Sequence, residues 1–324
     1  MRKKTVIAIF ILIVLGIIAV VGIASQKQQV SEKNASKVIR IGYQASSSLT
    51  VLEKAKGFLE EEFAKDGIKV EYKLFLAGPP MNEALASGEI DIANMGPLPA
   101  ISAKSSGIDV KAIARSYSDD FYYGLLIRPD SSITSVQDLK GKKVGVQVGS
   151  GAHFFFMLLL KQNGLSEKDL NVVSMPTSDQ KSALETGNVD AVVTWQPFVA
   201  AIELDKVGKI LADSNHVIRT AGVYLMRDEF GKDNPDLVKK FLKVHEQTVQ
   251  YLKNNPEESV KLMSVESKIA EGPLKQSLKT IDWDLNFTDA DVNTLIQVKD
   301  LMKEDKKLKN DFDVNTLIDK SYLQ

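Results

Sequence analysis

Cysteine is absent from all 324 residues, which excludes disulfides, zinc–thiolate sites, iron–sulfur clusters and cysteine nucleophiles together. The same absence removes the residue through which a lipid anchor would be attached. An excess of one charge sign is also missing, because 41 Lys and Arg stand against 42 Asp and Glu. A net charge of -1 gives no electrostatic reason to expect nucleic acid as a partner.

Catalytic and metal-binding motifs are lacking as well. The chain has no Gly-x-Ser-x-Gly elbow, no His-Glu-x-x-His pair and no Walker Gly-x-x-x-x-Gly-Lys loop. The three histidines, His153, His216 and His245, are scattered without the spacing of metal ligands. We therefore predict a protein that is not an enzyme and that needs neither a metal nor another cofactor.

One long apolar run is present near the N-terminus. Three basic residues in the first four positions precede residues 6–24, a stretch of 19 residues without charge that is about 28 Å long as a helix. The basic residues predict a cytoplasmic start and export of the rest of the chain. Small residues at the end of the run fit a signal-peptidase site, so residues 1–24 are either a cleaved signal peptide or an uncleaved membrane anchor. Residues 25–37 are polar and indicate a tether.

From residue 38 onward, short β-rich runs alternate with helical patterns, which predicts an α/β fold with doubly wound, mostly parallel sheets. The predicted strands are 38–43, 68–75, 89–95, 110–116, 121–128, 143–146, 171–176 and 189–195. The predicted helices among them are 49–65, 81–87, one from Pro97, 150–162 and 180–185. After residue 227 the pattern is helical, with helices at 235–254, from Pro256, near Pro273 and at 288–302.

Two pairs of similar short segments, which we call the sequence echoes, indicate that the α/β pattern is duplicated. Residues 41–44 (IGYQ) match 144–147 (VGVQ) at an offset of 103, and 84–91 (ALASGEID) match 183–190 (ALETGNVD) at an offset of 99. Two echoes in the same order at nearly equal offsets predict two related lobes.

We place the first part of lobe 1 at residues 38–126 and lobe 2 at 127–222. Residues 223–324 would return to lobe 1 and add a helical tail. The strand-like links at 125–128 and 223–227 are then candidate hinges.

Candidate ligand groups lie where predicted strands end and helices begin, because helix N-termini offer unpaired N–H groups and partial positive charge to an anion. The turn Gly149-Ser150-Gly151-Ala152-His153 is the best candidate. From this turn alone, an ordinary N-cap is the favoured interpretation of Ser150, and a single histidine such as His153 is more often a residue without a ligand. Trp195, Tyr43, Tyr122 and Tyr123 can be core residues or walls of a binding site.

Several of these segments resemble the substrate-binding proteins of ABC importers for aliphatic sulfonates, taurine and nitrate, which have the type II periplasmic-binding-protein fold. The segments are IRIGYQ (39–44), LAGPPMNEALASGEIDIANMG (76–96), DSSITSVQDLKGKKVGVQVGSGAH (130–153) and ALETGNVDAVVTWQPF (183–198). The resemblance implies two lobes that close on a small molecule. Carried over by position, the residues facing the cleft would be Gln44, Gly78, Pro79, Gly96, Ser150, Gly151, His153, Thr194 and Trp195, with Tyr43 and Trp195 flanking the organic part of the ligand.

The chain departs from that family at two acidic positions. Sulfonate-binding relatives commonly have Gly-Asp-x-Pro-Pro where this chain has Gly96-Pro97-Leu98-Pro99-Ala100, and Trp-Asp-Pro-Phe where it has Trp195-Gln196-Pro197-Phe198. Both departures make the predicted pocket less acidic. We therefore expect a plain organic anion, an alkanesulfonate, in preference to a ligand with an amino group such as taurine.

The resemblance thus implies an extracytoplasmic, monomeric receptor that delivers a small anionic solute to ABC permease subunits served by a cytoplasmic ATPase, with no nucleic-acid partner. Residues 6–24 could hold it at the membrane. Alternatives are a nitrate, taurine or neutral-heterocycle receptor, an anchored sensor ectodomain, or an enzyme like the pyrimidine synthase of thiamine biosynthesis. That enzyme family relies on a cysteine-rich segment, so the lack of cysteine counts against it.

Overall fold

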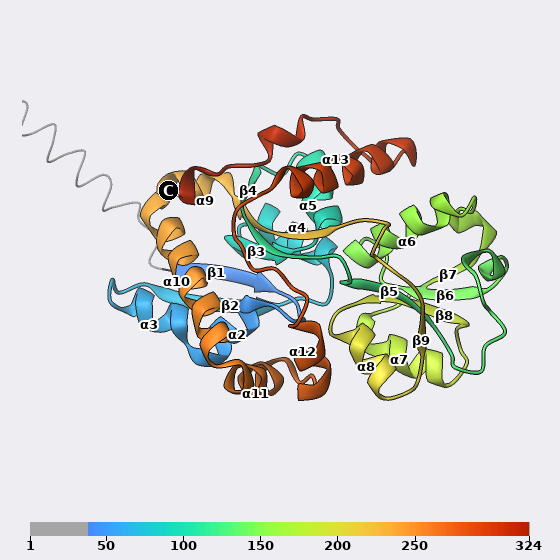
Figure 1. Ribbon diagram of the computed structural model, residues 1–324. Helices are drawn as coiled ribbons and strands as arrows, with labels where there is room; N and C mark the ends of the chain where they lie inside the picture. The colour runs from blue at the N-terminus through green and yellow to red at the C-terminus, as the bar shows by residue number, and fades with distance from the viewer. Residues whose placement is uncertain (1–37, 324) are drawn as a thin grey trace, which may run out of the picture.

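The computed structural model describes residues 38–323, so the predicted leader at 1–24 and the tether at 25–37 lie outside the described residues. Within the described part, no helix is both long and apolar enough to cross a membrane. The chain forms two five-stranded sheets, each covered by helices, which lie beside each other as two lobes (Figure 1). The α/β class with two sheets that was predicted from the sequence is confirmed.

The first sheet has the strand order β2-β1-β3-β10-β4. Strand β1 pairs in parallel with β2 and β3, whereas β10 runs antiparallel to β3 and β4. The strands are β1 (Val38–Tyr43), β2 (Lys69–Leu74), β3 (Ile92–Met95), β4 (Val110–Asp119) and β10 (Thr220–Arg227). The helices between them are α2 (Leu49–Lys56), α3 (Phe58–Ala64), α4 (Gly78–Ala86) and α5 (Pro97–Ser105).

The second sheet has the equivalent order, β7-β6-β8-β5-β9. Strand β6 is parallel to β7 and β8, and β5 is antiparallel to β8 and β9. The strands are β5 (Tyr123–Ile127), β6 (Lys143–Val146), β7 (Asn171–Ser174), β8 (Ala191–Trp195) and β9 (Lys209–Asp213). The α-helices of this lobe are α6 (Gly151–Gln162), α7 (Thr177–Glu185) and α8 (Phe198–Leu204), with 3₁₀ turns η1 (Val136–Leu139) and η2 (Glu167–Asp169).

The sequence echoes correspond to equivalent structural positions in the two lobes. Asp91 accepts a hydrogen bond from the backbone N–H of Arg40 at 2.9 Å, and Asp190 accepts one from the N–H of Lys143 at 2.8 Å. Each aspartate thus ties the residue before one strand (β3 or β8) to the neighbouring central strand, at the third residue of β1 and the first residue of β6. The repeated Gly-x-aliphatic-Asp element is therefore a sheet-joining device that the lobes share.

The chain passes between the lobes at residues 120–122 and 214–219, since β4 precedes the first passage and β10 follows the second. The segments predicted as hinges lie in strands instead: 125–127 belong to β5, which Arg128 directly follows, and 223–227 belong to β10. Their strand-like sequences reflect membership of the sheets. Strand β5, which follows β4 in the chain, belongs to the second sheet, and β10 belongs to the first.

The C-terminal part is helical, as the sequence predicted. It contains α9 (Asp228–Asp233), α10 (Pro235–Asn254), α11 (Pro256–Ser267), α12 (Glu271–Ser277) and α13 (Asp289–Glu304), with short turns η3 (Val314–Thr316) and η4 (Ser321–Leu323). Helices α10 and α11 pack on α2, and α13 packs on α5, all in the first lobe, whereas α12 packs on α8 of the second lobe. A capping box starts α13, because Thr288 accepts from the N–H of Asp291 while the Asp291 carboxylate accepts from the N–H of Thr288.

Three features of the local structure differ from the sequence expectation. The predicted helix 49–65 is broken into α2 and α3 at Gly57, whose φ of 75° lies in the left-handed region that ends helices. Helix α4 starts three residues before its predicted start, because Pro79 and Pro80 occupy the first turn, where a missing N–H is tolerated. Elements α8, β9 and α9 have no counterpart among the predicted elements.

Candidate ligand-binding cleft

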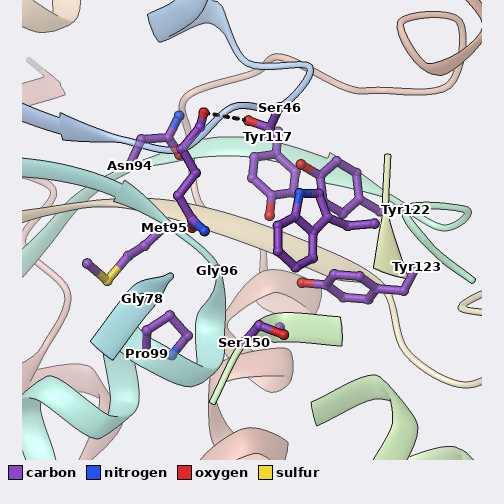
Figure 2. A pocket seen from close by; sticks show the side chains of 13 residues that line it. Ser46, Gly78, Asn94, Met95, Gly96, Pro99, Tyr117, Tyr122, Tyr123 and Ser150 are labelled. Carbon is purple, nitrogen blue, oxygen red and sulfur yellow. Dashed lines mark hydrogen bonds between the residues drawn. The ribbon is translucent and has the colours of Figure 1, made fainter. Parts of the chain in front are cut away.

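A pocket lies between the two lobes, where strands of both sheets end. Both lobes contribute to its lining, which leaves about 40 Å³ of free space. The lining residues are Gln44, Ser46, Gly78, Asn94, Met95, Gly96, Pro99, Tyr117, Tyr122, Tyr123, Ser150, Gly151 and Trp195 (Figure 2). This space is small for a ligand of several heavy atoms, so we expect the lobes to move apart when such a ligand enters.

Helix starts converge on this pocket, as the sequence predicted. Helix α4 begins at Gly78, α5 is capped by Gly96 and α6 is capped by Ser150. Prolines in the first turns of α4 and α5 remove most of the N–H groups that those helices would offer. The N-terminus of α6 is thus the richest source of free backbone donors at the cleft.

The α6 turn is organised around the Ser150 hydroxyl. This oxygen accepts a hydrogen bond from the N–H of His153 at 3.2 Å, which leaves its own proton free to be donated. The N–H groups of Gly151 and Ala152 are the first of the helix and have no acceptor within it. Ser150 is therefore an N-cap and a potential ligand donor at once, so the two interpretations of the sequence are compatible.

The two lobes come very close around this turn. A Cβ built on Gly96 of the first lobe would lie 3.7 Å from the Cα of Gly151. One built on Gly149, which has a φ of 81°, would lie 3.1 Å from Cγ of Pro79. One built on Gly151 would lie 2.0 Å from the Tyr123 hydroxyl oxygen, so only glycine leaves room for that tyrosine. The glycines at this level allow the backbones to meet.

The repeat-related glutamines also meet here. The side-chain amides of Gln44, from the first lobe, and Gln147, from the second, both donate to the carbonyl oxygen of Leu76. Because Leu76 follows β2, the bond from Gln147 links the two lobes. Thr177 donates to the Oε1 atom of Gln147 at 3.0 Å and fixes the orientation of its amide.

An aromatic wall forms one side of the pocket, opposite Asn94 and Met95 (Figure 2). The rings of Tyr117 and Tyr122 stack with centroids 4.4 Å apart, and Tyr123 meets Tyr122 edge-on at 5.4 Å. Tyr123 also faces Trp195 across the β5–β8 ladder. Burial raises the pKa of Tyr122 and of Tyr123 above the usual value, so both hydroxyls stay neutral.

The lining of this pocket contains no Asp, Glu, Lys, Arg or His among residues 38–323. No group of three or more potential metal ligands is found in that range either. Chemically, the cleft offers hydroxyl, amide and backbone N–H groups beside apolar ring faces. Such a set can hold an anion by hydrogen bonds and helix dipoles without a formal counter-charge.

Comparison with known proteins identifies the family. Residues 45–259 match the NMT1/THI5-like family. The chain belongs to this family. It is 30% identical over 331 residues to a Bacillus subtilis (strain 168) protein named as a candidate aliphatic sulfonates-binding protein, with 100% of this chain and 96% of that protein covered.

Two solved structures extend the comparison. The alkanesulfonate-binding protein of Xanthomonas axonopodis pv. citri, bound to MOPS, superposes with a TM-score of 0.80 at 25% identity, covering 88% of this chain and 98% of that one. The periplasmic aliphatic sulphonate-binding protein of Escherichia coli gives a TM-score of 0.76 at 27% identity, covering 89% and 99%. The family resemblance and the two-lobed fold inferred from sequence motifs are confirmed.

In this NMT1/THI5-like protein, six of the ten predicted site residues line the pocket: Gln44, Gly78, Gly96, Ser150, Gly151 and Trp195. The other four lie outside the lining. Pro79 packs on Gly149 beside the pocket, and Thr194 is fully buried in β8.

The remaining two predicted residues make contacts elsewhere. Tyr43 donates from its hydroxyl to Glu266 of α11 at 3.2 Å. His153 is 4% exposed, and its ring contacts Gly149 and Glu167 instead of the lining of the pocket. Neither ring is a wall of the cleft.

Seven lining residues are absent from the predicted site: Ser46, Asn94, Met95, Pro99, Tyr117, Tyr122 and Tyr123. Asn94 and Met95 directly precede the predicted Gly96, so extending that turn by two positions would have found them. For Tyr122 and Tyr123, the sequence does not decide between a place in the hydrophobic core and a place in the wall of the binding site. Tyr117 carries no local signal, because it lies inside β4, a strand buried along most of its length.

Proposed function

We propose that this protein is an extracytoplasmic solute-binding receptor of an ABC importer and that it captures an alkanesulfonate between its two lobes. The observation that carries the proposal is the uncharged cleft, in which the α6 N-terminus with Ser150 lies beside an aromatic wall. The sulfonate-binding names of the relatives support the same ligand class.

The chemistry of the cleft suits a sulfonate. A sulfonate keeps its charge at every physiological pH and spreads it over three oxygens, so several neutral donors can share it. Ser150 and the N–H groups of Gly151 and Ala152 would hold this group, at the positive end of the α6 dipole. Trp195 and the tyrosines would cover the apolar part of the ligand.

The lack of a carboxylate in the lining disfavours a ligand with an ammonium group. Burying an ammonium without an acidic partner carries a large desolvation penalty. We therefore propose that simple alkanesulfonates bind more tightly than taurine.

A ligand panel measured by titration calorimetry tests this function. Ethanesulfonate and butanesulfonate should bind with one site per chain, and taurine should bind at least tenfold more weakly. Sulfate and nitrate serve as controls for the anionic end alone, and an uncharged pyrimidine serves as a control for the rings alone. Binding of nitrate or of the pyrimidine without any sulfonate binding would overturn the proposal.

We also propose that residues 1–24 direct export and that 25–37 tether the receptor. The division into lobe 1, lobe 2 and a return to lobe 1, predicted at 38–126, 127–222 and 223–324, belongs to the same proposal with its boundaries moved to the crossings at 120–122 and 214–219. The monomeric state belongs to it as well. Mass spectrometry of the receptor from membrane and soluble fractions tests the leader. A mature N-terminus near residue 25 indicates cleavage, an intact chain in membranes indicates an anchor, and an intact chain in the cytoplasm would contradict export.

A further inference from the structure

A line of polar contacts leads from the anion-binding turn to the surface of the second lobe. Nδ1 of His153 accepts a hydrogen bond from the N–H of Gly149 at 3.2 Å, and Nε2 lies 2.6 Å from Oε1 of Glu167. Because Nδ1 is an acceptor here, the ring proton is on Nε2 and is donated to the carboxylate. The hydrogen bond from His153 lowers the pKa of Glu167 to about 2, so Glu167 is ionised at neutral pH.

The next member of this line belongs to the other lobe. Nζ of Lys307 donates to Oε2 of Glu167 at 2.9 Å. Lys307 follows α13, which packs on α5 and β10 of the first sheet. A second ion pair, between Lys161 of α6 and Glu304 of α13, crosses the same junction at 2.5 Å.

Opening of the lobes would separate Glu167 from Lys307, whereas the contact between His153 and Glu167 would stay within the second lobe. The ion pair therefore stabilises the closed state, which is also the state that encloses a ligand. A contact that favours the closed state raises the apparent affinity without touching the ligand, because it increases the population competent to hold it.

We infer that His153 and Glu167 are positioning residues for the anion-binding turn and that Lys307 couples them to lobe closure. His153 holds the N–H of Gly149, and with it the start of α6, in the orientation that presents Ser150. Lys307 completes the arrangement from the opposite lobe. The inference rests on the proposed function only for the nature of the ligand.

The lysine is tested by Lys307→Met, which keeps most of the apolar stem and removes the charge. Lys168→Met is the matched control, since Lys168 is exposed on the same surface groove between α6 and α13 and forms no ion pair within residues 38–323. Stopped-flow fluorescence with butanesulfonate should show dissociation about three- to tenfold faster in Lys307→Met, with an unchanged association rate. Lys307→Arg should restore the slow dissociation. Added salt should speed dissociation of the wild type more than that of Lys307→Met, which keeps only the Lys161–Glu304 pair across the junction.

A double-variant cycle tests the coupling through Glu167. If Lys307 acts through this carboxylate, Lys307→Met should change dissociation less in a His153→Leu background than in the wild type. Equal effects in the two backgrounds would show that the ion pair acts independently and would overturn the coupling. Equal dissociation rates in Lys307→Met and Lys168→Met would refute the proposed role of Lys307 in holding the lobes closed.

Closure can also be followed without any ligand. The chain has no cysteine, so the exposed residues Glu83 of the first lobe and Glu185 of the second can be replaced by cysteine and labelled for energy transfer. Lys307→Met should lower the closed fraction of the empty protein, and Lys168→Met should not. This measurement decides the role of Lys307 in closure even if no sulfonate binds, so failure of the ligand proposal and failure of this one are distinguishable.

Discussion

Replacement of Ser150 separates a stabilising role from a ligand-binding one. The hydroxyl caps α6 by accepting the N–H of His153 at 3.2 Å, and its own proton can be donated into the cleft. Loss of an N-cap costs about 1 kcal/mol of stability on replacement by alanine but only a few tenths on replacement by glycine. Loss of a hydrogen bond to a charged ligand costs about 1–3 kcal/mol of binding free energy.

We therefore expect Ser150→Ala and Ser150→Gly to weaken butanesulfonate binding alike, by about 5- to 150-fold. The free energy of unfolding should fall by about 1 kcal/mol in the alanine variant and much less in the glycine variant. Ser48→Ala is the matched control, because Ser48 caps α2 by accepting the N–H of Val51 at 3.4 Å and does not line the pocket. It should lose stability and keep its affinity.

Calorimetry for affinity and urea unfolding for stability give the two numbers independently. An unchanged dissociation constant in Ser150→Gly would refute the reasoning and reduce Ser150 to an N-cap. A loss of affinity in Ser48→Ala equal to that in Ser150→Ala would attribute both effects to general destabilisation.

The same geometry supports three more predictions. Gly151→Ala places a methyl group 2.0 Å from the Tyr123 hydroxyl oxygen, so it should lower the free energy of unfolding in urea by about 1–3 kcal/mol and weaken ligand binding. Gly272→Ala is the control and should change neither quantity, because its Cβ would lie at an ordinary 3.5 Å from Leu204. The low pKa of Glu167 predicts a contribution to stability that is complete above pH 4.5 and is lost as the pH falls towards 2. The difference in unfolding free energy between wild type and Glu167→Gln should be about 1 kcal/mol at pH 6, because Glu167 is partly exposed and water screens its contacts, and it should close in acid unfolding curves. A difference that is constant with pH would contradict this. Calorimetry along an alkanesulfonate series should show the binding free energy improving by about 0.8 kcal/mol per buried methylene in the wild type and by less in Trp195→Ala. An equal gain per methylene in both proteins would show that Trp195 does not contact the apolar part of the ligand.

Local sequence signals predicted much of the fold because they report on short segments. The predicted alternation of strands and helices is present, and the matched segments 84–91 and 183–190 end in aspartates with equivalent places in the two lobes. Each depends on residues within about one turn or one strand of each other, where propensity and capping chemistry act directly.

The site was predicted less completely because it is made of side chains from distant parts of the chain. Tyr117 and Trp195 line one pocket only because β4 and β8 end at the same interface of the two lobes. His153 follows a glycine-rich turn and resembles a ligand in the sequence, yet its ring is directed to Glu167. Which side of a helix start faces a cleft depends on how that helix packs, and this is not encoded in the turn itself.

The sequence by itself determined that the protein is α/β with two related halves, that it lacks thiol chemistry, and that helix starts are the places where an anion can be held. The tertiary structure decided which of those starts keep free N–H groups at the cleft, which rings form its wall, and where the chain crosses between lobes. The physical reason is that hydrophobic periodicity and capping act over a few residues. Sheet order and lobe closure, by contrast, arise from packing between segments that lie far apart in the chain, such as Gln147 and Leu76 or Glu167 and Lys307.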